Sequence, residues 1–334
     1  MTEERVLLAH GDGGQLMTEL IERVFVSRLG TGEPPGDDAA RLNGSGRLVF
    51  TTDAFVVDPI FFPGGDIGRL AVCGTVNDLA AAGARPVALS ASFILEEGLP
   101  IVDLERIVDS MAAAAREAGV CVICGDTKVV PRGRADRVYI STSGVGQVPE
   151  GVNVSGARAR PGDAVLVSGP VGDHGLAVLS RREGLEFDSP IVSDCAPLAG
   201  LVQEVLGAAP AVHVLRDPTR GGLATALNEI ARQSAVQIEL EERAIPVREA
   251  VAAACELLGL DPLYAANEGK MVLLVAPEAL EPVFVALRGH PLGREAAVIG
   301  RVMAGPAGRV LLRTPLGTHR ILDRHVGEQM PRIC

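Results

Sequence analysis

The sequence predicts an α+β protein built from two α/β domains, and three observations carry this prediction. Its 334 residues are enough for two ordinary domains with substantial cores. Hydrophobic residues make up 47% of the chain and no low-complexity run interrupts it, which is typical of a folded globular protein. Segments that alternate like strands follow segments of helical period along most of the chain. This order favours sheets covered by helices.

The first domain is predicted at residues 46–150, after a glycine-rich segment at residues 1–45. Strands are expected at 47–58, 86–97, 120–130 and 137–148, and helices at 66–84 and 101–119. Asp66 stands where a helix cap is needed, and Gly83 lies near the end of that helix. We therefore expect a four-stranded sheet with helices on one face. The uncovered face would need another partner, such as a second subunit.

The second domain is predicted at residues 161–305, and a linker rich in Gly, Arg and Pro precedes it at 151–163. It begins with the apolar run AVLVSGPVG and alternates helices and strands to about residue 303. Helices are expected near 174–182 and 195–207, in LATALNEIARQS and in VREAVAAACELLG, and strands in VQIEL and NEGKMVLLV. The polar residues 306–334 are predicted to form a mobile tail that ends in Cys334.

Composition argues against several classes of function. The net charge is −11, aromatic residues make up 3% of the chain, and tryptophan is absent. Nucleic acids and anionic membranes demand clustered Lys and Arg, so neither is an expected partner. A nucleotide stays possible if divalent cations mediate its binding. The N-terminus does not resemble a signal peptide and no apolar stretch approaches about eighteen residues, so we expect a cytoplasmic protein without membrane spans.

The six cysteines show no disulfide framework spacing, as is usual for reduced thiols in the cytosol. Five of them are expected in the core: Cys73, Cys121, Cys124, Cys195 and Cys255. The pair Cys121 and Cys124 lies in an apolar strand, where side chains three apart point to opposite faces, so zinc or redox work is poorly supported there. His174 and the histidines after it show no paired metal spacing and are interpreted as structural or surface residues.

Acidic residues near the ends of predicted strands are the most informative feature. They are Asp37 and Asp38 in PPGDDAA, Asp53 in FTTDAF, Asp78 in GTVNDLA and Asp126 in ICGDTK. Singly, such residues are most often solvated or caps. Asp78 differs because its helix is otherwise apolar, and an unpaired carboxylate is costly to bury there. If the acids converge, they repel by roughly 4 kcal/mol per pair at ~4 Å, and Mg²⁺ is the natural counter-charge.

The motifs TTDAFVVDPIFFPGGDIGRLAVCGTVNDLAAAGARP, CGDTKVV, RDPTRGGLATALNEIA, NEGKMV and the terminal PRIC resemble one family nearly end to end. This is the HypE family of carbamoyl dehydratases in [NiFe]-hydrogenase maturation. It belongs to the ATP-binding superfamily of aminoimidazole ribonucleotide synthetase and selenophosphate synthetase. The acidic motifs mark the superfamily, and the PRIC ending is specific to the family. The resemblance implies two domains of the aminoimidazole ribonucleotide synthetase type and a homodimer joined sheet to sheet.

The resemblance also implies a reaction. A partner carbamoyltransferase, HypF, loads a carbamoyl group on the terminal cysteine. ATP then dehydrates this S-carboxamide to a thiocyanate, and cyanide passes to iron on the HypC–HypD scaffold complex. An amide oxygen is a poor leaving group, so it must first become a phosphate ester. A base then removes the remaining N–H proton as phosphate departs, and a cation must hold the developing charge.

The resemblance assigns roles to particular residues. Asp53, Asp78 and Asp126 match the Mg²⁺–nucleotide acids with Asn77 beside them, and Asp37 and Asp38 match a loop that closes over phosphates or metal, so the implied metal ligands are Asp38, Asp53, Asp78 and Asp126. Lys128 is implied to contact phosphate or the amide oxygen. Glu268 is the candidate base, with Lys270 as its charge partner. Arg216 and Asp217 open the RDPTRGG run, whose backbone N–H groups could bind phosphate or simply start a helix.

Cys334 becomes intelligible as a carrier. A cysteine on the last residue could be an accident of a frayed end, and a prenyl anchor is excluded because it needs the cysteine four residues from the end. From Gly317 onward, 18 residues could span up to ~60 Å. The thiol can therefore leave to be loaded and return to an ATP cleft. Two alternatives stay open: a superfamily kinase such as selenophosphate synthetase or thiamine monophosphate kinase, and a non-enzymatic carrier.

Overall fold

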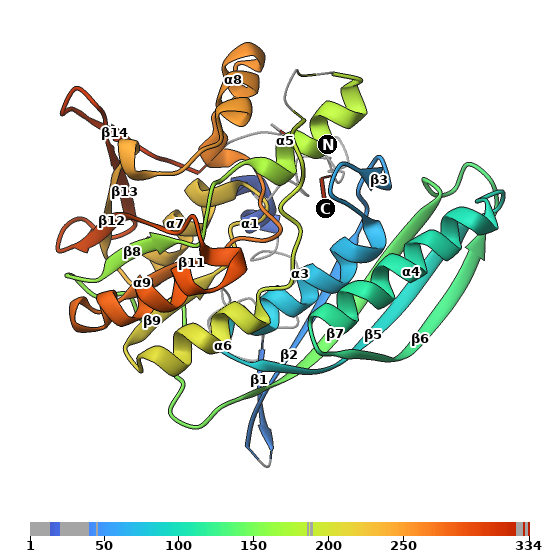
Figure 1. Cartoon of the computed structure of the whole chain (residues 1–334), viewed down its shortest axis with the longest axis horizontal. Coiled ribbons are helices and arrows are strands. Elements are labelled where there is room, and N and C mark those ends of the chain that lie inside the picture. The colour runs from blue at the N-terminus through green and yellow to red at the C-terminus, as the bar shows by residue number, and fades with distance from the viewer. Residues whose placement is uncertain are drawn as a thin grey trace, which may run out of the picture.

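A computed structural model describes residues 14–20, 40–44, 46–185, 187, 190–324, 330 and 333–334. Two α/β domains lie side by side, as the sequence predicts, and helix α3 lies between them (Figure 1). Asp37 and Asp38 lie outside the described residues. Within the described residues, no helix is long and apolar enough to cross a membrane.

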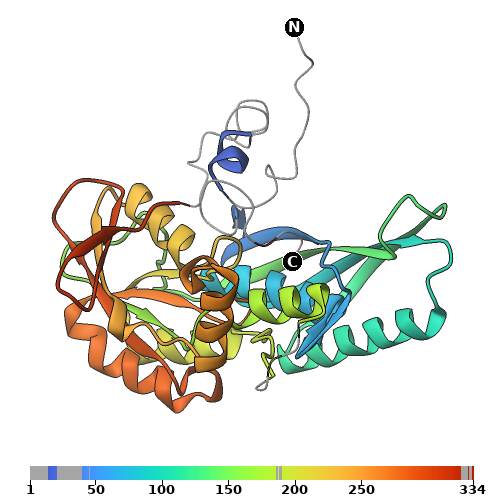
Figure 2. The same cartoon turned by 90° about the horizontal axis from the view of Figure 1, so that it is seen from above.

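The first domain holds a five-stranded sheet of order β1-β2-β7-β5-β6. Its strands are β1 (Ala40–Gly44), β2 (Gly46–Phe55), β5 (Arg85–Glu96), β6 (Cys121–Val130) and β7 (Val138–Val148). The four predicted strands are all present, and β1 adds a fifth that the sequence reasoning placed in an irregular segment. Helices α3 (Ile67–Ala81) and α4 (Ile101–Glu117) lie on one face, as predicted, while no helix of the described residues covers the other face, which is called the bare face below (Figure 2).

Helix α3 is buried on almost all sides because two domains pack against it. The predicted cap is confirmed, since Asp66 Oδ1 accepts from the backbone N–H of Gly68 at 2.8 Å and of Arg69 at 3.0 Å. A Cβ added at Gly68 would stand 2.2 Å from the carbonyl oxygen of Ile107, so α3 and α4 approach closely at this point. A short hairpin, β3 (Phe61–Phe62) and β4 (Gly65–Asp66), leads into the helix.

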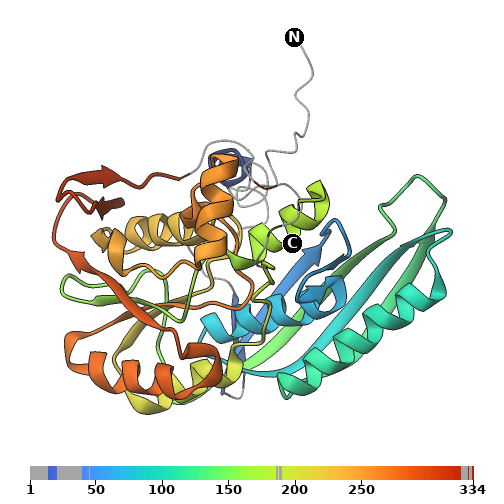
Figure 3. The same ribbon diagram turned by 45° about the horizontal axis from the view of Figure 1, so that its top comes forward.

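The second domain holds a seven-stranded mixed sheet of order β14-β13-β10-β12-β8-β11-β9. The strands are β8 (Ala164–Val167), β9 (Val212–Arg216), β10 (Gln237–Glu241), β11 (Val272–Val275), β12 (Ala297–Met303), β13 (Arg309–Arg313) and β14 (His319–Ile321). Central strands β8 and β11 are buried throughout, because helices cover both faces of this sheet (Figure 3). The helices are α5 (Asp173–Glu183), α6 (Ala199–Ala208), α7 (Gly222–Gln233), α8 (Glu249–Leu258) and α9 (Leu280–Gly289), and a short α1 (Gln15–Leu20) precedes both domains.

Two expectations need correction. Strands β13 and β14 belong to the second sheet, so ordered structure continues to residue 321 and a tail cannot begin at residue 306. Cys121 and Cys124 are exposed in the single subunit, because β6 is an edge strand without a covering helix. The other core cysteines, Cys73, Cys195 and Cys255, are buried as predicted.

Candidate active site around the terminal cysteine

The C-terminal residue lies between the two domains, close to α5 and the β3–β4 hairpin (Figures 1 and 3). The backbone N–H of Val56, just after β2, donates to an oxygen of the terminal carboxylate of Cys334 at 3.2 Å. Nε2 of His174 on α5 lies 2.7 Å from the carbonyl oxygen of Ile333. The side chains of Met330 and Ile333 are buried. The end of the chain is therefore docked in its own subunit.

The Cys334 thiol lies in a strongly perturbed electrostatic environment. Burial raises its pKa to about 12, Glu268 and Asp53 act in the same direction, and Arg220 opposes them. The docked thiol is therefore protonated and neutral at physiological pH. Three groups of the second and first domains thus converge on the sulfur that the sequence singled out as a carrier.

Arg220 is the cation of this cluster. Cys334 makes the largest contribution to raising the pKa of the guanidinium, followed by Asp53, Glu268 and Asp78, while burial lowers it. The residue lies in the loop before α7, inside the RDPTRGG run. Sequence reasoning considered only the backbone of that run and missed this side chain. The sequence feature that could have identified Arg220 is its position directly before the glycine pair that opens a helix.

Glu268 is the carboxyl group closest in character to a general base. Its side chain is buried, and burial raises its pKa well above the usual value, with further contributions from Asp217, Asp53 and Asp194. A carboxyl group with a raised pKa is the better proton acceptor once it is ionised. The structure therefore brings the predicted base and the predicted carrier together.

The backbone of Glu268 is clamped from both domains. Its N–H donates to Oδ1 of Asp194 at 3.0 Å, and its carbonyl accepts from Nδ2 of Asn77 at 3.1 Å. Asn77 also donates to the carbonyl of Ala196 at 3.1 Å and accepts from the N–H of Leu198 at 2.8 Å. These bonds use the whole amide group of Asn77. Asn77 therefore supports the backbone of Glu268 and is not placed as a direct ligand of the nucleotide.

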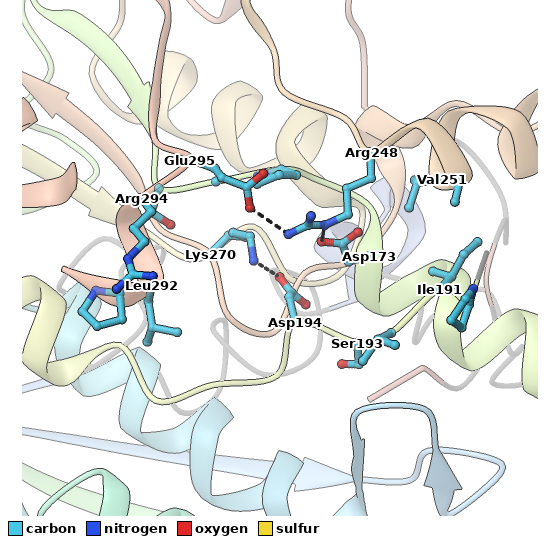
Figure 4. A pocket seen from close by; sticks show the side chains of 17 residues that line it. Asp173, Ile191, Ser193, Asp194, Arg248, Val251, Lys270, Leu292, Arg294 and Glu295 are labelled. Carbon is cyan, nitrogen blue, oxygen red and sulfur yellow. Dashed lines mark hydrogen bonds and ion pairs between the residues drawn. The ribbon is translucent and has the colours of Figure 1, made fainter. Parts of the chain in front are cut away.

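The two residues after Glu268 complete the clamp. A Cβ on Gly269 would stand 1.8 Å from the carbonyl oxygen of Asp194, so only glycine fits there. Nζ of Lys270 pairs with Oδ2 of Asp194 at 3.0 Å (Figure 4). Lys270 therefore neutralises Asp194 instead of Glu268. A cavity of about 420 Å³ lies on this side of the loop, and Asp173 and Arg248 also line it (Figure 4).

Asp53 and Asp78 lie on facing elements of the first domain. Asp53 belongs to β2 and its Oδ1 accepts from the N–H of Ala54 at 2.7 Å, but burial dominates and raises its pKa. Asp78 belongs to α3, as expected for an acid that faces a polar site, and its Oδ2 accepts from the hydroxyl of Thr51 at 2.7 Å. Both act on Arg220. Two of the predicted nucleotide acids therefore share one site.

Asp126 and Lys128 lie elsewhere in the subunit. Both are exposed on edge strand β6, where their side chains pair at 2.7 Å. Through the register of the sheet, Asp126 aligns with Ser92, Ser141 and Ala54, so it lies on the bare face, opposite to Asp53. Three strand spacings separate the two acids by about 14 Å. A single subunit therefore does not assemble Asp53, Asp78 and Asp126 around one ion.

The RDPTRGG run divides its predicted residues between two surroundings. Asp217 is buried and raises the pKa of Glu268, so it belongs to the cluster. The guanidinium of Arg216 pairs with Glu229 on α7. Among the side chains that the structure describes, no set of three His, Cys, Asp or Glu is arranged to hold a metal ion.

Comparison with known proteins identifies the two domains. The AIR synthase related protein models match residues 36–148 with their N-terminal domain and residues 160–313 with their C-terminal domain. Thiamine monophosphate kinase from Aquifex aeolicus shares this fold, with a TM-score of 0.64 at 21% identity.

Several relatives with far higher identity are carbamoyl dehydratases. The carbamoyl dehydratase HypE of Rhizobium leguminosarum bv. viciae is 56% identical over 333 residues, which cover 99% of this chain and 95% of that protein. The crystal structure of the hydrogenase maturation protein HypE in complex with ATP is 51% identical, with a TM-score of 0.84, and covers 99% of this chain and 100% of that one. A crystal structure of a HypE–HypF complex is 50% identical, with a TM-score of 0.86, over 92% of this chain and 99% of that one. The chain belongs to the HypE family of carbamoyl dehydratases.

Proposed function

We propose that this chain uses ATP to dehydrate a carbamoyl group carried on its own Cys334, giving a thiocyanate. The observation that carries the proposal is the docking of Cys334 beside Glu268, Arg220 and Asp53. The relative solved with ATP supports a nucleotide in the same fold. The terminal thiol is half-buried and lies in the field of Arg220, Glu268 and Asp53, which favours a role in the reaction over a frayed chain end.

The reaction balances as two steps on the S-carboxamide. The amide oxygen attacks the terminal phosphorus of ATP, ADP leaves with the electron pair of the broken P–O bond, and the nitrogen releases the first of its two protons to solvent. A base then removes the last N–H proton while the C–O bond breaks, and inorganic phosphate departs. Sulfur keeps its bond to carbon throughout, so the product is S–C≡N on Cys334. The overall change is the loss of one water to ATP.

Glu268 is the proposed base for the second step. Its backbone is fixed by Asn77 and Asp194, so its carboxyl group is held in place while the tail docks. The raised pKa favours proton transfer from nitrogen to this oxygen. Asp217 and Asp53 supply negative charge that keeps the affinity of Glu268 for the proton high.

Arg220 is the proposed partner for the phosphoryl group. It stands among Cys334, Asp53 and Asp78, so its guanidinium can move between the acids and phosphate oxygens. We also propose Mg²⁺ as the cofactor. Mg²⁺ is usually held by one or two carboxylates together with phosphate oxygens, so Asp53 and Asp78 fit this requirement although the residues that the structure describes form no complete cage of protein ligands. Bound there, it would neutralise phosphate charge.

The tail, which here means the residues after Arg324, is proposed to leave the site so that Cys334 can be loaded. The solved HypE–HypF complex supports HypF as the protein that carbamoylates Cys334. A HypC–HypD complex, as the acceptor of cyanide, is proposed from the family resemblance, and a cytoplasmic location stays a prediction from the sequence. Withdrawal from a buried site is possible because few bonds hold the described tail residues, the shortest of which joins Ile333 to His174.

A homodimer joined through the bare sheet faces is also proposed. Edge strand β6 is exposed from Cys121 to Val129, and apolar side chains such as Phe50 and Ile94 lie exposed on the bare face. Asp126 and Lys128 stand on the same surface. A partner subunit packed against the bare face would bring Asp126 and Lys128 toward the cluster around Glu268 in that partner. Lys128 would then contact phosphate across the interface.

Mass spectrometry of the last peptide tests the proposal. The full-length protein would be incubated with HypF, carbamoyl phosphate and ATP, and a protease that cleaves after glutamate would release the residues after Glu328. The expected result is a carboxamide on Cys334 that loses one water only when ATP is present. A carboxamide that persists with ATP, or a Cys334→Ala variant that still forms thiocyanate, would contradict the proposal.

A further inference from the structure

We propose that the first turn of α5 is the docking site of the tail, and that His174 is the positioning residue that holds Cys334 against Glu268. The inference rests on the proposed function, because a contact that holds the tail matters only if the tail moves between loading and dehydration. The hydrogen bond between His174 and Ile333 is called the latch below. From the sequence, His174 is interpreted only as a structural or surface residue. Its pairing with Ile333 becomes visible only when the end of the chain is placed.

His174 makes two hydrogen bonds that fix its tautomer. Nε2 lies 2.7 Å from the carbonyl oxygen of Ile333, which can only accept, so Nε2 carries the proton. Nδ1 then accepts a hydrogen bond from the hydroxyl of Ser193, at 2.8 Å. The oxygen of Ser193 accepts in turn from the N–H of Cys195 at 3.1 Å. The ring is fully buried, and its edge-to-face contact with Phe62 fixes its plane.

Gly175 provides the space in which the tail lies. A Cβ on this residue would stand 2.7 Å from the sulfur of Met330 and 3.0 Å from the backbone nitrogen of Ala266. The first turn of α5 therefore contacts the tail twice, through a donor at residue 174 and through a missing side chain at residue 175. Both contacts face residues of the tail that are buried.

The docking site and the base are held by one framework. The N–H of Gly172 donates to Oδ1 of Asn267 at 2.8 Å, and Asn267 directly precedes Glu268. Nδ2 of Asn267 donates to the carbonyl of Pro218 at 3.0 Å, in the loop that carries Arg220. A tail docked on His174 is thereby placed at a set distance from both groups. Helix α5 therefore helps to place Cys334, together with the N–H of Val56, although the helix contributes no group to the chemistry.

The latch suits a carrier because it is weak and uncharged. Burial lowers the pKa of His174, so the ring is neutral and its bond to Ile333 is an ordinary one. Such a bond contributes little net stability, since a withdrawn carbonyl is solvated by water. Withdrawal then stays accessible. A weaker latch should speed every reaction of the withdrawn thiol and slow every reaction of the docked one.

Two substitutions at one position separate the latch from a purely structural role. Glutamine places an amide N–H near the position of Nε2, whereas asparagine reaches only the position of Nδ1. His174→Asn should therefore lose the bond to Ile333, and His174→Gln should keep it. Ser180→Ala is the matched control, because Ser180 is buried on the same helix and its hydroxyl donates to the carbonyl of Leu176 on that helix.

The test measures alkylation of Cys334 by iodoacetamide in the full-length, unmodified protein. The peptide after Glu328 reports Cys334, and the exposed Cys121 and Cys124 report reagent activity in the same sample. We expect His174→Asn to raise the rate at Cys334 about three- to tenfold and His174→Gln to stay within about twofold of the wild type. Equal rates in the wild type and the asparagine variant, or equal increases in both variants, would overturn the inference.

The second readout separates this inference from the proposed function. Dehydration of preloaded Cys334 in a single turnover should slow in His174→Asn, while loading by HypF should not slow. If wild-type protein alkylates slowly but never dehydrates its carboxamide, the latch stands and the proposed function fails. If wild-type dehydration proceeds but His174→Asn neither alkylates faster nor dehydrates more slowly than the Ser180→Ala control, the latch fails alone.

Discussion

Asp53 and Asp126 come from similar acidic motifs on one sheet, yet the two residues have opposite surroundings. Asp53 faces the helices on β2, where burial raises its pKa. Asp126 faces the bare side of β6, where Lys128 holds its pKa below the usual value. The buried group belongs to a cluster that one subunit assembles. The exposed pair is accessible on the surface of the subunit, and its proposed role depends on the proposed homodimer.

Replacing Glu268, in the buried cluster, should reduce the rate of dehydration most. Glu268→Gln keeps the shape of the side chain but cannot accept a proton, so dehydration of carbamoylated Cys334 should fall by about 10²- to 10⁴-fold. Loading by HypF should be unchanged, because the thiol is loaded away from the site. Single-turnover mass spectrometry measures both steps. Glu117→Gln, an exposed acid paired with Arg69, is the control and should dehydrate at the wild-type rate.

Mixing two variant subunits tests whether the exposed Lys128 completes the active site of the partner subunit. Lys128→Ala and Glu268→Gln should each inactivate the homodimer. Heterodimers of the two variants, purified through two different tags, should regain about half of the wild-type dehydration rate, because one of two sites then has both groups. Heterodimers as inactive as their parents would place Lys128 in the same site as the Glu268 of its own subunit.

The stability of the ligand-free protein should reveal the cost of burying Glu268. Its folded pKa is raised, so the folded state holds this proton after the unfolded state has released it, and stability falls as pH rises above the unfolded value near 4.5. Glu268→Gln avoids this loss. Its melting temperature should match the wild type at pH 4 and exceed it increasingly toward pH 8. A difference that does not change with pH would show that the carboxyl group is not perturbed.

The smallest effect is expected from the hydroxyl that supports Asp78. Thr51→Val removes this donor on the covered face of β2, and should lower the free energy of unfolding by about 1 kcal/mol and dehydration by a few-fold. Thr52→Val changes the neighbouring residue, whose side chain lies on the bare face. Chemical denaturation compares the two. A larger loss of dehydration from Thr52→Val would reverse the assignment of the faces.

Local features of the sequence sufficed for much of the fold. The cap at Asp66, the two helices on one face and the buried Cys73 follow from short-range patterns, and the structure confirms them. Strand β13 pairs on both sides and alternates between buried and exposed residues, and the sequence analysis overlooked that alternation in RVLLR. Strand β14 escaped because it is short, exposed and at the edge of the sheet. Edge strands bury too little apolar surface to show a clear period.

The site could be predicted only in part, because its geometry depends on register and on the path of the tail. The motif around Glu268 pointed to a base, and the structure places it beside Cys334. The face of Asp126 could not be foreseen, since a register shift between Leu89 and Ser90 sets the alignment of β6 with β5. Arg220 and His174 were missed because their partners lie far away in sequence.

The titration of Cys334 tests the central claim most directly, since a docked carrier thiol is the basis of the whole account. Its alkylation rate would be followed from pH 7 to pH 11 in the intact protein and in a peptide of the last six residues. The peptide should level off near its ordinary pKa of 9.0, whereas the protein should keep rising, as expected for a docked thiol with a pKa of about 12. A protein profile that levels off with the peptide would show that Cys334 is not held among Glu268, Asp53 and Arg220.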